Sequence, residues 1–187
     1  MPAPAGSPTS PKMVAKRLGQ ALLGILGYMG VIHWLVPDCV GAFRPSLAAL
    51  IAKSPALGAS SDVTSVVAGY VGLALVSPAL AALAGVATAR VMRHLGGQRL
   101  RIVAVACVLH ALLCYAAGQQ ALRVGALATD ANHRAVVELG ALVRFQGLTS
   151  LCSLAPAVLG AWLGCKLWPW PATPPPPPPL ETGEGDA

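Results

Sequence analysis

Charged residues are scarce in this chain. They make up only 11% of its 187 residues, whereas hydrophobic residues make up 55%. A soluble domain is usually about 25% charged. A chain so poor in charge needs lipid around its apolar surface, because that surface would otherwise drive aggregation. We therefore expect an integral membrane protein rather than a soluble, alanine-rich helical bundle.

Acidic residues are absent from every long apolar run. The seven that exist are Asp38, Asp62, Asp130, Glu138, Glu181, Glu184 and Asp186. The net charge of +6 therefore comes from basic residues beside the apolar runs. This pattern is typical of membrane orientation and phospholipid contact. Basic residues are not interleaved with aromatic ones, so we expect no binding of nucleic acid.

Signatures of catalysis are also missing. The chain has no HExxH motif, no glycine-rich phosphate loop and no acidic residue in a predicted span that could act as a general base. None of its five cysteines is spaced as CxxC, which argues against the membrane thiol oxidoreductases. We therefore predict that the protein is not an enzyme, and we expect no metal site and no cofactor.

Four apolar segments are long enough to cross a membrane as helices, at about residues 18–37, 63–89, 102–117 and 142–165. The predicted fold is all-α: a polytopic four-transmembrane-helix bundle over residues 18–168. We expect a disordered basic segment at residues 1–17 and a proline-rich, acidic tail at residues 169–187. Pro37 is expected to end the first span, and residues 44–53 to form a short helix at the membrane interface.

Two pairs of similar stretches suggest an internal repeat. VIHWLV, which contains His33, resembles VLHALL, which contains His110. SPALAALAG, which contains Pro78, resembles APAVLGAWLG, which contains Pro156. Two tandem helical hairpins related by a pseudo-twofold axis would explain the pairs, and coincidence in an Ala/Leu/Val-rich background is the alternative.

Both repeated prolines fall within predicted spans, where a proline removes one backbone hydrogen bond. We predict helix kinks at Pro78 and Pro156. Ser77 lies beside the first proline, and Ser150 and Ser153 precede the second, so their hydroxyls can satisfy freed carbonyl groups. The kinks either open a cavity or fit a bend in the bundle.

Small residues recur along the spans and predict close helix packing. The candidates for packing positions are Gly24, Gly27, Ala81, Gly85, Gly160 and Gly164. Such residues favour a tight four-helix bundle that docks on partner helices or associates with itself.

The two histidines of the repeat raise the question of a shared metal or haem. With a rise of about 1.5 Å per residue, His33 lies about 24 Å and His110 about 14 Å from the basic edge of its span. This mismatch of about 10 Å predicts that the two do not share one ion or haem. His33 is expected at the far interface beside Trp34. His110 is the remaining ligand or proton-transfer candidate, or else forms a structural hydrogen bond with Ser77, Thr149, Ser153 or a carbonyl.

Basic residues predict the orientation. The tightest cluster comprises Arg90, Arg93, Arg99 and Arg101, in the short turn after the second span. With Lys12, Lys16, Arg17 and Lys166, it places eight positive charges on the side of both termini, against five on the other side. The positive-inside rule therefore predicts that both termini are cytoplasmic, or on the equivalent side of an organelle.

Six consecutive prolines, from Pro174 to Pro179, predict an extended polyproline II rod in the tail. The rod either binds an SH3- or WW-type domain or acts as a spacer.

Taken together, these features favour a small non-enzymatic scaffold, assembly factor or accessory subunit of a membrane complex. One alternative is a small transporter, channel or lipid-binding protein with a cavity near Pro78, Pro156 and His110. A second alternative is a haem-binding redox subunit that uses His110.

Overall fold

The structure is a computed structural model that describes residues 11–53, 61–127 and 133–169. The chain folds into the long helices α1 (Pro11–Ala52), α2 (Ser61–Val91), α3 (Gln98–Leu127) and α4 (His133–Cys152), the shorter α5 (Leu154–Leu167), and a 3-10 turn, η1 (Arg93–Leu95). The all-α prediction is confirmed over the described residues. Four helices, α1 to α4, are long and apolar enough to cross a membrane.

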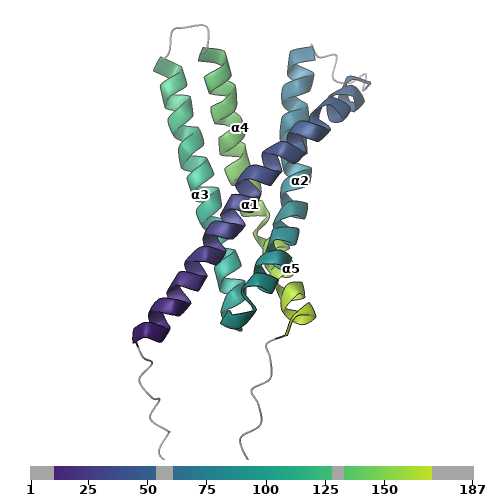
Figure 1. Ribbon diagram of the computed structural model, residues 1–187. Helices are drawn as coiled ribbons and strands as arrows, with labels where there is room; N and C mark the ends of the chain where they lie inside the picture. Colours follow the sequence, from purple (N-terminus) through teal and green to yellow (C-terminus); the bar gives the residue numbers. More distant parts are fainter. Residues whose placement is uncertain (1–10, 54–60, 128–132, 170–187) are drawn as a thin grey trace, which may run out of the picture.

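The helices form an antiparallel bundle that one of them crosses obliquely (Figure 1). α3 packs along α4, and α5 packs against the final half of α2. α1 runs diagonally across the bundle and contacts both α2 and α3. The start of α1 and the end of α5 lie at the same end of the bundle, next to the turn between α2 and α3.

The first helix is much longer than predicted. α1 begins at Pro11, seven residues before the expected span, and continues through Pro37 and Pro45 to Ala52. The prediction that Pro37 ends the helix is wrong, and the expected interfacial helix at residues 44–53 is the last part of α1. A proline removes one intrahelical hydrogen bond and crowds the preceding turn, yet a helix can continue through it when packing holds both sides, and Val36 and Val40 on either side of Pro37 are buried.

The third span is also longer than predicted, because Gly118 does not end it. α3 continues to Leu127, nine residues beyond this glycine. Gly118 instead marks a close crossing with α4: a Cβ added there would lie 2.5 Å from the Arg144 amide nitrogen and 2.7 Å from the Gly140 carbonyl oxygen. The segment between the third and fourth predicted spans, residues 118–141, is therefore largely helical, and within this segment residues 128–132 are the ones outside the described chain.

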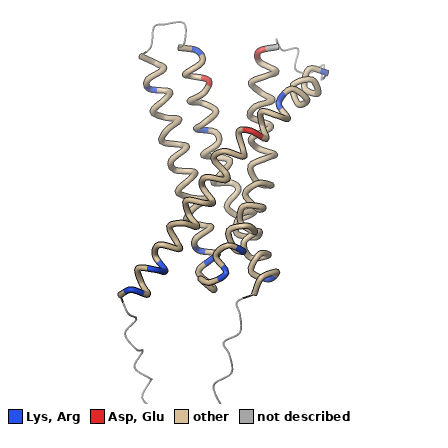
Figure 2. Tube along the Cα trace, in the orientation of Figure 1, with Lys and Arg blue, Asp and Glu red and all other residues tan. Residues whose placement is uncertain are grey.

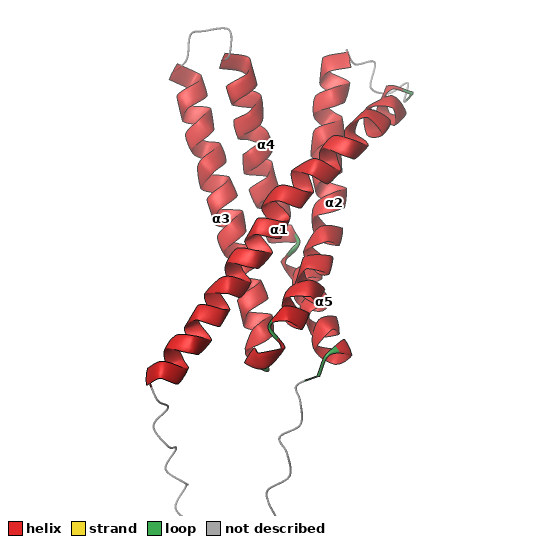
Figure 3. Cartoon of the chain, viewed as in Figure 1, coloured by secondary structure: helices red, strands yellow, loops and turns green. Residues whose placement is uncertain are grey.

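The fourth span consists of two helices rather than one. α4 ends at Cys152 and α5 begins at Leu154, with a turn at Ser153 (Figure 3). Pro156 explains the break, because it has no N–H to donate to the Cys152 carbonyl and its ring crowds that turn. The Ser153 hydroxyl donates to the Thr149 carbonyl oxygen at 2.6 Å. Pro78, by contrast, lies inside the continuous helix α2.

Glycine and alanine make the closest contacts in the bundle, where α2 crosses α5. A Cβ added at Gly85 would overlap the Ala157 carbonyl, and one added at Gly160 would overlap the Ala82 carbonyl. Gly164 faces Val86 and Ala89 in the same way, and Ala81 is buried nearby. Small residues therefore let these two backbones touch.

Charged residues gather at the two ends of the bundle and leave its middle apolar (Figure 2). Eight Lys and Arg residues lie at the end that carries the start of α1 and the end of α5. The opposite half of the bundle carries the other five, together with Asp38, Asp62 and Glu138, the acidic residues within the described ranges. This distribution matches the two charge groups expected from the sequence.

Candidate functional site

The structure brings His33 and His110 together. Their ring centroids are 6.0 Å apart, with the ring planes at 72°. The predicted depth mismatch is therefore wrong, and so is the expected place of His33 at the interface. α1 crosses the bundle obliquely (Figure 1), so each of its residues advances along the bundle axis by less than the full helical rise.

His110 lies in the interior of the bundle and uses both of its ring nitrogens. Its side chain is 2% exposed. Nδ1 lies 3.0 Å from the Ser150 hydroxyl of α4, and Nε2 lies 3.5 Å from the Cys114 sulfur, one helical turn further along α3. A hydroxyl is the expected kind of partner for a buried imidazole, but Ser150 replaces the partners predicted for it, Ser77, Thr149 and Ser153.

Further polar groups surround this histidine and satisfy one another. The Cys107 thiol donates to the Ser150 carbonyl oxygen at 3.1 Å. The Thr149 hydroxyl donates to the Gln146 carbonyl oxygen at 3.0 Å and lies 3.3 Å from the Ser77 hydroxyl. Because Thr149 has already donated its proton, Ser77 is the donor in that second bond. Two sets of hydrogen bonds therefore meet on α4: Thr149 is linked to Ser77 of α2, and Ser150 is linked to Cys107 and His110 of α3.

Three potential metal ligands converge at the edge of this polar cluster. The ligand atoms of His33, His110 and Cys114 all lie within 4.8 Å of one another. His110 and Cys114 are buried, whereas His33 is exposed on α1. Cys114 was missed as a candidate in the sequence, although its spacing of four from His110 places both side chains on one face of a helix. The contribution of His33 depends on the tilt of α1, which the sequence does not show.

The space beside His110 is narrow. Tyr28, Ile32, Ser77 and Cys107 help to enclose it, and it has no room for a water-sized sphere. A haem needs a wide slot between its two axial histidines. In the described chain, the buried side chains of Tyr28 and Ile32 of α1 instead line the space beside the His110 ring. The local geometry fits a single ion and does not fit a haem.

The four arginines of the predicted basic cluster differ in their surroundings. Arg99 is only 4% exposed, whereas Arg90, Arg93 and Arg101 are exposed. The Arg99 guanidinium donates to three carbonyl oxygens: Gly96 at 2.9 Å, Ala89 at 3.2 Å and Trp168 at 3.1 Å. Arg90 lies 5.0 Å above the Trp168 ring. Arg99 therefore ties the end of α5 to the turn between α2 and α3.

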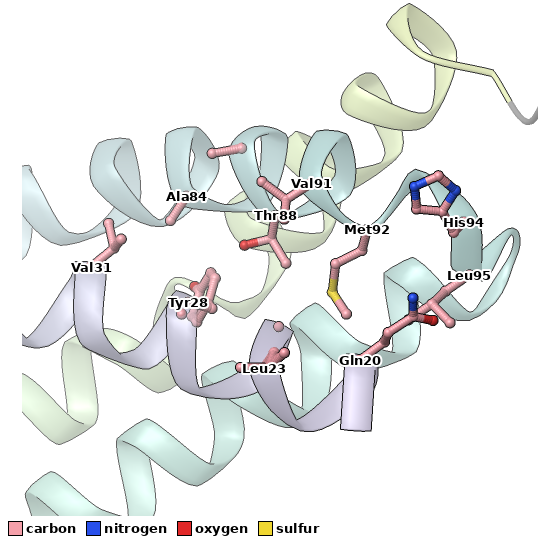
Figure 4. Close-up of a pocket in the computed structure, with 13 residues that line it drawn as sticks. Gln20, Leu23, Tyr28, Val31, Ala84, Thr88, Val91, Met92, His94 and Leu95 are labelled. Carbon is pink, nitrogen blue, oxygen red and sulfur yellow. The ribbon is translucent and has the colours of Figure 1, made fainter. Parts of the chain in front are cut away.

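The predicted packing glycines of α1 differ from those of α2 and α5. A Cβ added at Gly24 would overlap the flexible end of Met92, whereas a Cβ added at Gly27 would have no heavy atom within 4 Å apart from the adjacent part of α1 itself. Gly27 therefore packs against nothing within the described chain. Both glycines line a groove of about 280 Å³ between α1 and the end of α2, together with Tyr28, Thr88 and Met92 (Figure 4).

Residues 170–187 of the predicted tail, including Pro174 and Pro179, lie outside the described residues. Within the described residues, two features are candidates for a function: the polar cluster around His110, and the side of α1 at Gly27 that contacts no other helix. Comparison with protein-family models, curated proteins and solved structures finds no match to this chain.

Proposed function

We propose that this chain is a non-enzymatic accessory or scaffold subunit of a membrane complex, and that it binds a transmembrane helix of another protein through α1. One observation carries the proposal. The glycines on one side of α1 have no heavy atom of the described chain within 4 Å of an added Cβ; they are Gly19, Gly27, Gly30 and Gly41. At 3.6 residues per turn, they fall within an arc of about 80°.

Elsewhere in the bundle, glycines lie where two helices cross closely. At the crossings of α2 with α5 and of α3 with α4, glycines bring two backbones into contact, as Gly85, Gly118 and Gly160 show. Lipid tails gain little from a flat glycine surface, whereas a second helix can approach it closely. The open glycine face of α1 therefore suits a partner helix, and the neighbouring groove lined by Leu23, Gly27 and Val31 can take a side chain from it.

Gly27→Leu is expected to release the partner. Nothing within the chain occupies the space at Gly27, so the fold tolerates leucine there, while the added side chain holds a partner helix away. The measurement is affinity purification of the full chain from membranes in mild detergent, with quantitative mass spectrometry. A protein recovered in stoichiometric amount with the wild type is expected to fall at least about tenfold with Gly27→Leu, which corresponds to about 1.4 kcal/mol.

A matched control separates loss of the interface from general damage. Ala116→Leu adds similar bulk at an exposed position of α3, a different helix from the one that carries the open glycines, and is expected to retain the partner. A wild-type chain that purifies alone as a monomer would contradict the proposal. Recovery of a second copy of this chain as the sole partner would instead identify self-association and reject the accessory role.

We also propose that both termini lie on the cytoplasmic side of the membrane, or its equivalent in an organelle. The eight basic residues at that end of the bundle support this orientation, because the described residues of the opposite half include five basic and three acidic ones. An N-glycosylation acceptor inserted at residues 128–132 is therefore expected to be glycosylated in microsomes, and one placed before residue 11 is not. The reverse pattern would show the inverted orientation.

The structure supports the transporter alternative less well than the scaffold role. Pro156 does break the fourth span, and His110 lies near the break. However, the space beside His110 is too narrow for a water molecule, and its polar groups are paired with one another. The scaffold role therefore has the stronger structural argument.

A further inference from the structure

We propose that His33, His110 and Cys114 bind one copper(I) ion. The proposal does not depend on the accessory role, because it rests on different residues: His110 and Cys114 belong to α3, and His33 lies outside the arc of open glycines on α1. It makes the buried His110 a metal ligand. From the sequence, His110 could have been a ligand, a proton-transfer residue or a residue with a structural hydrogen bond only.

The distances fit a small first-row metal ion. Metal–nitrogen bonds of about 2.0 Å and metal–sulfur bonds of about 2.3 Å place two ligand atoms of one ion roughly 3.5 Å apart. The His110 Nε2 atom and the Cys114 sulfur are already 3.5 Å apart. The His33 ligand atom lies within 4.8 Å of both. Because His33 is exposed, its ring can rotate to close the remaining gap without disturbing the core.

The surroundings of His110 orient it for this role. Ser150 hydrogen-bonds Nδ1 at 3.0 Å, which leaves Nε2 directed at Cys114. Histidine ligands of metals usually carry such a hydrogen bond on the other ring nitrogen, because it fixes the tautomer and the ring orientation. With a metal on Nε2, Nδ1 keeps its proton and donates it to the Ser150 hydroxyl. Ser150 is thus a positioning residue for the ion.

Charge favours copper(I) over zinc. Binding releases the thiol proton of Cys114, so one thiolate, two neutral imidazoles and Cu⁺ form a complex with no net charge. The same ligands around Zn²⁺ leave one positive charge, and the cluster contains no carboxylate to balance it. An unbalanced charge is costly inside an apolar bundle. Three ligands, one of them a thiolate, also suit Cu⁺, whereas zinc seeks a fourth.

Competition with a copper(I) chelator tests the proposal. The full chain, purified in detergent without oxygen and with ascorbate, is titrated against the coloured copper(I) complex of bicinchoninate. We expect the protein to take up one Cu⁺ per chain. His33→Ala and Cys114→Ser are each expected to weaken binding more than about 100-fold, and Ser150→Ala about 10- to 100-fold. X-ray absorption should show one sulfur and two nitrogen ligands.

The other thiols need control, because any exposed cysteine can hold Cu⁺. The titration is therefore made in a chain with Cys39, Cys152 and Cys165 replaced by serine, and Cys107 retained because it is buried and hydrogen-bonded. His94→Ala, at an exposed histidine outside the cluster, is expected to leave binding unchanged. His33→Ala is the decisive variant, because an exposed side chain can be removed without loss of the fold, which size-exclusion chromatography verifies.

Two results would overturn the proposal. Equal copper affinity in the parent chain and in His33→Ala would place the metal elsewhere. Tight uptake of Zn²⁺ with no uptake of Cu⁺ would show that the charge argument fails. Neither result would affect the accessory role, which Gly27→Leu tests separately.

Discussion

Gly160→Leu is expected to destabilise the bundle strongly. Even the first carbon of the new side chain would overlap the Ala82 carbonyl of α2, and a backbone atom cannot move aside as a side chain can. α5 would have to leave α2 and expose the small-residue surface that both helices bury. Overpacking of this kind usually costs 1–3 kcal/mol, and here about 3 kcal/mol or more is expected because the obstacle is backbone. The fraction of protein that remains monodisperse in detergent after heating measures the loss.

A glycine on the open side of α1 provides the matched control. Gly27→Leu adds the same side chain where no heavy atom lies within 4 Å, so its thermal stability should equal that of the wild type. Gly160→Ala should already show part of the loss, because the overlap begins at Cβ. If Gly160→Leu and Gly27→Leu have the same stability, then α5 does not pack on α2 as described.

The positions of the spans could be predicted from hydropathy, but the ends of the helices could not. Pro37 and Gly118 both have the residue type that commonly ends a helix, yet α1 and α3 continue through them. The buried residues Val36 and Val40 lie on either side of Pro37 and pack that part of α1 into the bundle, and a close contact with α4 explains Gly118. Such contacts exist only in the folded bundle, so local sequence signals do not reveal them.

In the candidate site, too, one residue could be predicted from the sequence, whereas its contacts with other helices could not. His110 could be identified because it is ionisable and lies within an apolar run. Its partners depend on how α4 is rotated about its axis and on how α1 is tilted, and neither quantity is encoded in spacing along one helix. Counting residues from the basic edge placed His33 about 10 Å deeper than His110, yet the two rings lie side by side. Likewise, the hydroxyl that bonds His110 belongs to Ser150 and not to Ser77.

Glycine has opposite roles on the two sides of this molecule, which the sequence alone does not distinguish. Gly85 and Gly160 face backbone within the chain, whereas Gly27 and Gly30 face outwards. Gly160→Leu thus tests the fold and Gly27→Leu tests the interface. If both variants lose the partner, the loss identifies the interface only when Gly27→Leu keeps the thermal stability of the wild type.

Arg99→Met is expected to release the end of α5 from the bundle. The variant keeps the aliphatic packing but removes a guanidinium that reaches the Gly96, Ala89 and Trp168 carbonyls together. Hydrogen bonds from charged donors contribute about 1.5–3 kcal/mol each, and water or lipid headgroups can replace some of them near the bundle end. A net loss of about 3 kcal/mol is therefore expected, measured as a lower melting temperature in detergent.

Arg101→Met separates this structural role from the loss of one positive charge. Arg101 lies on the same helix and at the same end of the bundle but is exposed, so its removal should leave the melting temperature unchanged. Arg99→Lys should recover only part of the loss, because an ammonium lacks the planar fork that reaches several acceptors at once. Equal destabilisation by Arg99→Met and Arg101→Met would show that charge at this end, rather than the three carbonyl contacts, stabilises the attachment of α5.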